Sequence, residues 1–170
     1  MIQLDKLVDS GKFGGPYTDM KPFVLLLAGL VIAADAQLVF EIGTGVLNST
    51  KAFLYGLEKT GGRIVSCDPV KEWNNFTHPQ FEFLQARSNE IASTWNRQID
   101  ILFIDGDHRY GQVLFDYKTF APFVKKNGLI IFHDSQLLEG PRKVSEGAKG
   151  LRRLTFEKTP GLTVLRKDES

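Results

Sequence analysis

Short apolar runs that alternate with helix-like segments constrain the fold of this chain more than any other feature. The runs that indicate strands cover Leu38–Ile42, Arg63–Cys67, Phe81–Leu84, Ile99–Ile104 and Leu129–Phe132. Most of them are apolar at successive positions, so both faces of each strand must be buried, as in a parallel sheet covered by helices on both sides. Helices are expected from Thr18 or Asp19 to about Ala36, and over Ser49–Lys59, Asn89–Trp95 and Gln112–Val124, after a glycine-rich loop at Gly11–Pro16.

The end of the chain shows a different pattern. Two runs, Leu151–Glu157 and Leu162–Arg166, are joined by a short link that contains Pro160-Gly161, which predicts a β-hairpin. We therefore expect an α/β fold with a doubly wound, mostly parallel, Rossmann-like sheet of about seven strands and a C-terminal antiparallel hairpin. Because no segment has the composition of a linker, residues 1–170 are predicted to form a single domain.

Charge and cysteine content exclude several classes of protein. The 170 residues include 21 Lys or Arg and 20 Asp or Glu, so the net charge of +1 does not favour nucleic acid as a partner. The single cysteine, Cys67, excludes an intramolecular disulfide and a multi-cysteine zinc module, and it suits a cytoplasmic location.

The longest apolar run, Phe23–Ala34, is shorter than the roughly 20 residues of a membrane span. It is expected to be a buried helix, and it would also allow a homodimer.

A glycine-rich loop follows the first predicted strand, where ligands bind in open α/β sheets. Its sequence is Glu41-Ile-Gly-Thr-Gly45, and Asp68 follows the second strand, where an acid can accept both hydroxyl groups of a ribose. The pattern differs from a dinucleotide site because Asn48 replaces the third glycine and Glu41 would lie near a pyrophosphate. S-adenosylmethionine is therefore favoured over NAD, and an ordinary tight turn between strand and helix is the alternative.

Acidic and histidine side chains follow the fourth and fifth main strands. Asp105, Asp107 and His108 leave one strand, and His133 and Asp134 leave its neighbour. Converging carboxylates suit Mg²⁺ or Ca²⁺, and an imidazole ligand would extend the choice to Mn²⁺ or Zn²⁺. Either histidine could instead act as a general base near neutral pH. Simple turns and helix caps are the structural alternatives for the aspartates.

These residues resemble those of a known family. Glu41-Ile-Gly-Thr-Gly45 followed by Ser49-Thr50 is similar to motif I of class I S-adenosylmethionine-dependent methyltransferases. Phe103-Ile-Asp-Gly-Asp-His-Arg-Tyr110, a helix with Asp116, and Asn127-Gly-Leu-Ile-Ile-Phe-His-Asp134 resemble the small-molecule O-methyltransferase branch. That branch includes sugar and antibiotic O-methyltransferases and cephalosporin-hydroxylase-like proteins.

The resemblance implies roles for individual residues. Glu41, Gly43 and Gly45 would line the methionine part of S-adenosylmethionine, with Thr44 and Ser49 as further cofactor-binding residues. Asp68 would bind the ribose, Ser88 would flank the adenine and Asp105 would lie beside the transferable methyl group. Asp105, His108 and Asp134 would be the catalytic residues, and Asp105 and Asp134 would hold Mg²⁺ in a metal-dependent enzyme. The acceptor would be a hydroxyl group of a small molecule.

Two departures from the family pattern keep other functions open. Leu47 stands where relatives often carry glycine, which would narrow the cofactor pocket, and His133-Asp134 replaces the paired acidic or amide residues of many metal-dependent relatives. A module that binds the nucleoside without catalysis is therefore one alternative. A nucleic-acid methyltransferase is another, because eight Lys or Arg residues lie between Arg142 and Lys167. An NAD oxidoreductase is the most distant one.

Overall fold

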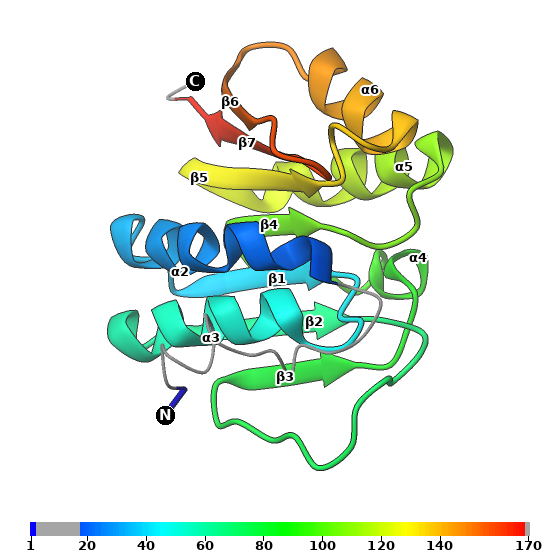
Figure 1. The fold of residues 1–170 in the computed structure, drawn as a ribbon. Coiled ribbons are helices and arrows are strands. Elements are labelled where there is room, and N and C mark those ends of the chain that lie inside the picture. The colour runs from blue at the N-terminus through cyan, green and yellow to red at the C-terminus, as the bar shows by residue number, and fades with distance from the viewer. Residues whose placement is uncertain (3–17, 169–170) are drawn as a thin grey trace.

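The computed structural model describes residues 1–2 and 18–168, and the predicted loop at residues 11–16 lies outside them. Its centre is a seven-stranded sheet in the order β3-β2-β1-β4-β5-β7-β6 (Figure 1). The strands are β1 (Leu38–Ile42), β2 (Arg63–Cys67), β3 (Phe81–Leu84), β4 (Ile99–Ile104), β5 (Val124–His133), β6 (Leu151–Phe156) and β7 (Leu162–Lys167).

The pairing of the strands confirms the predicted fold class. β3, β2, β1, β4 and β5 run parallel, whereas β7 pairs antiparallel with both β5 and β6. The reversal of strand order beside β1 places the ends of β1 and β4 together, with Ile42 opposite Ile104. In a sheet of this kind, that edge is where ligands bind.

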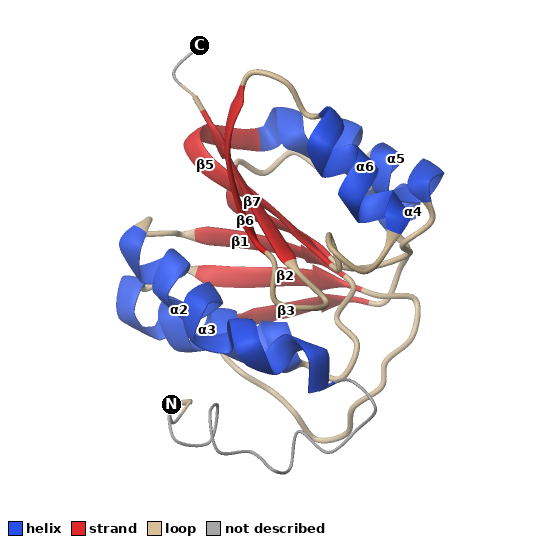
Figure 2. Ribbon diagram, turned by 45° about the horizontal axis from the view of Figure 1, so that its top comes forward, coloured by secondary structure: helices blue, strands red, loops and turns tan. Residues whose placement is uncertain are grey.

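Helices cover both faces of the sheet, as Figure 2 shows. A 3₁₀ helix η1 (Thr18–Phe23) leads into α2 (Val24–Ala33), which packs with α3 (Asn48–Thr60) on one face. The other face carries α4 (Ser88–Ile91), α5 (Tyr110–Phe120) and α6 (Glu139–Gly147), with the short η2 (Ala121–Phe123) after α5. Each face has its own apolar core. Phe53 stacks edge-on against Phe103 in the first, and Phe40 contacts Trp95 and Phe120 in the second.

Several element boundaries differ from the sequence-based expectation. The predicted helix over residues 112–124 ends at Phe120, because Pro122 has no N–H with which to continue it. β5 begins at Val124 rather than Leu129, and its polar start includes Asn127 at φ +64°. The first α-helix ends at Ala33, since the backbone of Asp35 is left-handed at φ +46°. α4 stops at Ile91, and α6 was not predicted.

Within the described residues, no helix combines the length and the apolar character that crossing a membrane requires. α2 is apolar along its whole length, yet Leu25 is 53% exposed and Ile32 is 45% exposed.

Candidate functional site

A cavity of about 730 Å³ opens at the carboxyl ends of β1, β2, β4 and β5. This volume falls in the range of small-molecule sites. Nine of the ten residues that the sequence suggested as site residues line it: Gly43, Thr44, Gly45, Ser49, Asp68, Ser88, Asp105, His108 and Asp134. The fold therefore brings together residues that follow four strands and residues that begin α3 and α4.

The loop after β1 needs glycine for two different reasons. Gly43 has φ +95°, and a Cβ atom there would lie 2.1 Å from the carbonyl oxygen of Asp105, so only a residue without a side chain lets β1 and β4 approach so closely. Gly45 has φ +47°, but a Cβ atom there would meet nothing within 4 Å. Gly45 therefore faces open space in a backbone conformation that disfavours side chains.

Asp68, at the end of β2, holds this loop in place. Its Oδ2 accepts hydrogen bonds from the backbone N–H groups of Thr44 at 3.1 Å and Gly45 at 3.2 Å. Its Oδ1 accepts one from the N–H of Val70 at 2.9 Å. A carboxylate offers about four lone-pair positions, so acceptor capacity remains for a ligand in the cavity.

Glu41 is the one predicted site residue whose side chain does not line the cavity. It is fully buried behind the loop, and its two carboxylate oxygens accept hydrogen bonds from the hydroxyl groups of Ser49 at 2.5 Å, Thr50 at 2.6 Å and Ser66 at 2.6 Å. Burial raises the pKa of Glu41 to about 7, against the opposing effect of these three donors. The side chain of Glu41 is therefore hydrogen-bonded to the start of α3 and does not face the cavity, where the predicted contact with methionine would lie.

Leu47 also differs from the expectation. Its side chain is 1% exposed and does not line the cavity, so it does not narrow the pocket. The residue has φ +73°, which orients the backbone for the start of α3.

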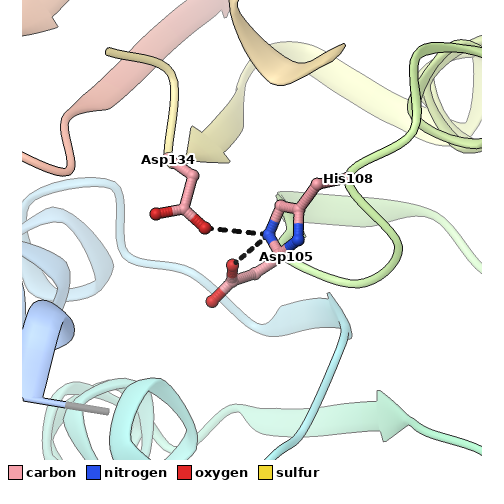
Figure 3. A group of neighbouring side chains, drawn as sticks. All are labelled: Asp105, His108 and Asp134. Carbon is pink, nitrogen blue, oxygen red and sulfur yellow. Dashed lines mark hydrogen bonds and ion pairs between the residues drawn. The ribbon is translucent and has the colours of Figure 1, made fainter. Parts of the chain in front are cut away.

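Asp105, His108 and Asp134 converge at the tips of β4 and β5 (Figure 3). Nε2 of His108 lies 2.9 Å from Oδ2 of Asp134 and 3.4 Å from Oδ1 of Asp105. From the buried side, Nδ1 of His133 lies 3.0 Å from the same Oδ1 of Asp105 and 3.5 Å from Oδ2 of Asp134. Each of the two carboxylates thus contacts both imidazole rings.

The electrostatics of this cluster follow from its geometry. Hydrogen bonds to Asp105 and Asp134 raise the pKa of His108 to about 9. Burial opposes protonation of His133, but the two carboxylates outweigh it and raise its pKa to about 10. Burial likewise opposes ionisation of Asp134, but the two histidines hold its pKa well below the usual range. With no cation bound, the two carboxylates therefore favour the imidazolium form of both rings near neutral pH.

The donor set fits a divalent cation. One ligand atom each from Asp105, His108 and Asp134 lies within 4.8 Å of the other two. Carboxylate oxygens suit Mg²⁺, and the imidazole nitrogen extends the fit to Mn²⁺ and Zn²⁺. A bound cation would take over the charge compensation that the imidazolium of His108 provides.

Two polar side chains on α5 complete the far wall of the cavity. Oδ1 of Asp116 accepts hydrogen bonds from the hydroxyl group of Ser88 at 2.6 Å and from Nε2 of Gln112 at 2.9 Å. Gln112 was not predicted as a site residue. Its spacing of four from Asp116 places both on one face of the helix, which is the only sequence signal that could have identified it.

Known proteins of related sequence point to one family. A family model described as a methyltransferase domain matches residues 40–135. A curated relative, an uncharacterized protein of Acanthamoeba polyphaga mimivirus, is 48% identical over 46 residues, which cover 27% of this chain and 21% of that protein. The chain thus spans about a fifth of the length of the curated relative it matches.

Solved structures share the fold over nearly the whole chain. An O-methyltransferase from Bacillus cereus, crystallised with S-adenosylhomocysteine, aligns with a TM-score of 0.75 at 16% identity over 99% of this chain and 93% of that one. The O-methyltransferase TomG from Streptomyces achromogenes, crystallised with S-adenosylmethionine, aligns with a TM-score of 0.73 at 16% identity over 99% and 92% of the two chains.

Proposed function

The chain belongs to the methyltransferase domain family, and we propose that it transfers the methyl group of S-adenosylmethionine to a hydroxyl group of a small molecule. The single observation that carries this proposal is the cavity, in which a glycine loop, the Asp68 carboxylate and the Asp105–His108–Asp134 cluster lie together. The two solved structures of similar fold, both O-methyltransferases bound to the donor or its product, support it.

The donor would be held along the tips of β1 and β2. The open space at Gly45 leaves room for the methionine part beside the loop and Ser49. Asp68 would accept hydrogen bonds from the ribose, and Ser88, at the start of α4, would lie beside the adenine. Glu41 would act indirectly, because it holds the hydroxyl groups of Ser49 and Thr50 at the first turn of α3.

In the proposed reaction, the bond between sulfur and methyl carbon breaks while a bond from the acceptor oxygen to that carbon forms, and the hydroxyl proton is released. Alignment of the two substrates supplies much of the rate enhancement. A divalent cation such as Mg²⁺, held by Asp105 and Asp134, would lower the pKa of the acceptor hydroxyl. We favour this arrangement over a simple base, because His108 is already protonated at neutral pH between these carboxylates.

A nucleic-acid methyltransferase has weaker support. Part of the basic C-terminal region is engaged within the chain, since Arg152 pairs with Asp168 and Arg153 donates to the backbone oxygen of Ser145. A module that binds the nucleoside without catalysis has less support, because Leu47 is buried and does not line the cavity.

We further propose that residues 1–170 act as one domain in the cytoplasm, a location that the single buried cysteine supports. The exposed side chains of Leu25 and Ile32 on α2 support a homodimer through that helix. Sedimentation of the wild-type protein and of a Leu25→Glu variant would test it, since the variant should sediment as a smaller species.

A turnover assay tests the proposed activity. The protein is incubated with Mg²⁺, S-adenosylmethionine carrying a labelled methyl group and a panel of phenolic, catecholic and sugar hydroxyl compounds. We expect labelled methyl ethers and an equal amount of S-adenosylhomocysteine from at least one member of the panel. Binding of the donor without transfer to any acceptor would favour the non-catalytic alternative, and absence of donor binding would contradict the proposal.

A further inference from the structure

The turn that carries Asp134 away from β5 begins in an uncommon backbone conformation. Asp134 has φ +56°, in the left-handed region that residues other than glycine rarely adopt. Its backbone oxygen accepts hydrogen bonds from the N–H groups of Leu137 at 3.1 Å and Leu138 at 2.8 Å, which close the turn. A conformation of this kind persists only where the surrounding structure holds it in place. The contacts around the turn therefore determine where the Asp134 carboxylate lies.

The tip of the C-terminal hairpin holds this turn through backbone contacts. The carbonyl oxygen of Pro160 accepts hydrogen bonds from the N–H groups of Gln136 at 3.0 Å and Leu137 at 3.1 Å. Gly161, at φ +91°, lies so close to Gln136 that a Cβ atom there would come within 3 Å of three atoms of that residue. The hairpin tip and the turn are thus in direct contact, although α6 and β6 separate them in the chain.

Buried hydroxyl groups connect the same two segments. Oγ1 of Thr163, on β7, donates to Oγ of Ser135 at 2.9 Å, and the two residues are 2% and 0% exposed. Oγ1 of Thr155, on β6, lies 3.1 Å from Oγ1 of Thr163. Because Thr163 uses its one hydroxyl proton on Ser135, Thr155 is the donor in this second contact. A chain of three hydroxyl groups therefore runs from the outer strand of the hairpin to the residue beside Asp134.

We infer that Thr163 is a positioning residue, because its hydrogen bond to Ser135 holds the Asp134 carboxylate in place. In that place Oδ2 of Asp134 lies 2.9 Å from Nε2 of His108, as Figure 3 shows. Without the Thr163 hydroxyl group, the buried Ser135 hydroxyl loses a hydrogen bond, and the turn shifts until another partner replaces it. The inference rests on the proposed function, which places Asp134 beside the acceptor.

Two substitutions separate the hydroxyl group of Thr163 from the shape of its side chain. Thr163→Val keeps the branched shape and removes the hydroxyl group, whereas Thr163→Ser keeps the hydroxyl group and removes the methyl group. The nitrogen and proton resonances of the His108 ring are recorded at pH 7 with a chelator present, and Asp134→Asn is the reference for a lost contact. We expect Thr163→Val to shift these resonances towards the Asp134→Asn spectrum and Thr163→Ser to match the wild-type protein.

A role in packing alone predicts the opposite order of the two variants. Thr163→Val would then give the wild-type spectrum, because valine fills nearly the same volume, and that outcome would overturn the inference. Equal shifts in both variants would overturn it as well. Thermal unfolding shows whether each variant is folded. If Thr163→Val does not fold, Ser135→Ala breaks the same hydrogen bond from its other end, and a wild-type spectrum of that variant would overturn the inference.

Thr155→Val is the matched control for these variants. It removes a hydroxyl group from the same chain but leaves the bond between Thr163 and Ser135 intact. Its His108 resonances should equal those of the wild-type protein. A shift as large as in Thr163→Val would overturn the assignment to Thr163.

Turnover of S-adenosylmethionine gives a second readout. Thr163→Val should reduce kcat by roughly tenfold to a hundredfold, the scale for residues that orient the ligands of a metal centre. Its KM for S-adenosylmethionine should stay at the wild-type value, because the proposed donor site lies along β1 and β2. A normal kcat in Thr163→Val would overturn the inference. A wild-type protein without turnover would instead contradict the proposed function, and the two failures are distinguishable because the ring resonances are measured without substrate.

Discussion

Nε2 of His108 lies 2.9 Å from Oδ2 of Asp134, although the two residues follow different strands of the sheet. The parallel pairing of β4 with β5 brings these strand ends together, and Oδ1 of Asp105 lies 3.4 Å from the same nitrogen. The imidazolium is the counter-charge for two carboxylates that would otherwise repel each other. We therefore expect the folding stability and the proposed catalysis to depend on pH and on metal ions.

The first prediction concerns stability in the absence of metal. In the folded protein the pKa of His108 is about 9, above its ordinary value of 6.5. The stability that protonated His108 contributes to the fold is therefore fully present below pH 6.5 and is lost as the pH rises through 9. The ionised form of Asp134 persists throughout this window, because its pKa is lowered. His108→Gln should therefore destabilise the protein more at pH 6 than at pH 9. The difference should be on the order of 1 kcal/mol, reduced by solvent screening of a partly exposed ring.

Urea unfolding of the wild-type protein and of His108→Gln, in buffer with a chelator, measures this difference. His133 contacts the same two carboxylates, so the difference reports the coupled cluster of both histidines rather than His108 alone. An equal effect of the substitution at both pH values would show that the ion pair does not form.

The second prediction concerns Asp68. Asp68→Ala removes both the ribose acceptor and the acceptor for the Thr44 and Gly45 amides. Affinity for S-adenosylhomocysteine should fall by roughly 1.5–3 kcal/mol, the scale of hydrogen bonds to a charged group. Glu72→Gln, which removes another carboxylate from the cavity wall, serves as a control for net charge and should bind normally. Unchanged affinity of Asp68→Ala would reject the ribose assignment.

The third prediction separates the two glycines of the loop. Gly45→Val should remain folded, with a loss of roughly 1–3 kcal/mol for a side chain at positive φ, and should lose donor binding because the side chain enters open space in the cavity. Gly43→Ala should instead lower the folding stability severely, because its Cβ would meet three backbone atoms of Asp105 and Gly106 closer than 3 Å. Thermal unfolding and calorimetry distinguish these effects, and a folded Gly45→Val protein with normal affinity would contradict the loop assignment.

The fourth prediction concerns the metal ion. If a cation held by Asp105 and Asp134 activates the acceptor, turnover should disappear with a chelator and return when Mg²⁺ or Mn²⁺ is added. Asp134→Asn should then reduce turnover by at least about a hundredfold, the upper scale for residues that support metal activity. Turnover that survives the chelator and rises with pH towards 9 would identify His108 as the base instead. The rise is expected near pH 9 rather than near 6.5, the pKa of an ordinary histidine, because Asp105 and Asp134 raise the pKa of His108.

The positions of the residues that line the cavity could be predicted from the sequence because parallel topology determines them. Once β1, β2, β4 and β5 are recognised, the residues that follow them must meet at one edge, and Gly43, Asp68, Asp105 and Asp134 do. The direction of an individual side chain could not be predicted in the same way. β1 is buried on both faces, so its pattern does not tell whether Glu41 faces the cavity or the core.

Element boundaries depended on interactions that local sequence does not reveal. The polar start of β5 resembles a loop, but it pairs with Ile99 of β4 through Val124. Polar α6 shows few apolar positions, and it packs against α5 through Val144 and its neighbours. The hydrogen bonds that hold Gln112 in the cavity wall depend on Ser88 and Asp116, which are 24 residues before and four residues after it.

Calorimetric titration of S-adenosylmethionine, S-adenosylhomocysteine and NAD into the same protein sample tests the central claim most directly. The cavity, with Asp68 as the proposed ribose ligand and Asn48 where a dinucleotide site needs glycine, predicts saturable one-to-one binding of both sulfur nucleosides and no binding of NAD. Binding of NAD without either sulfur nucleoside would contradict the account.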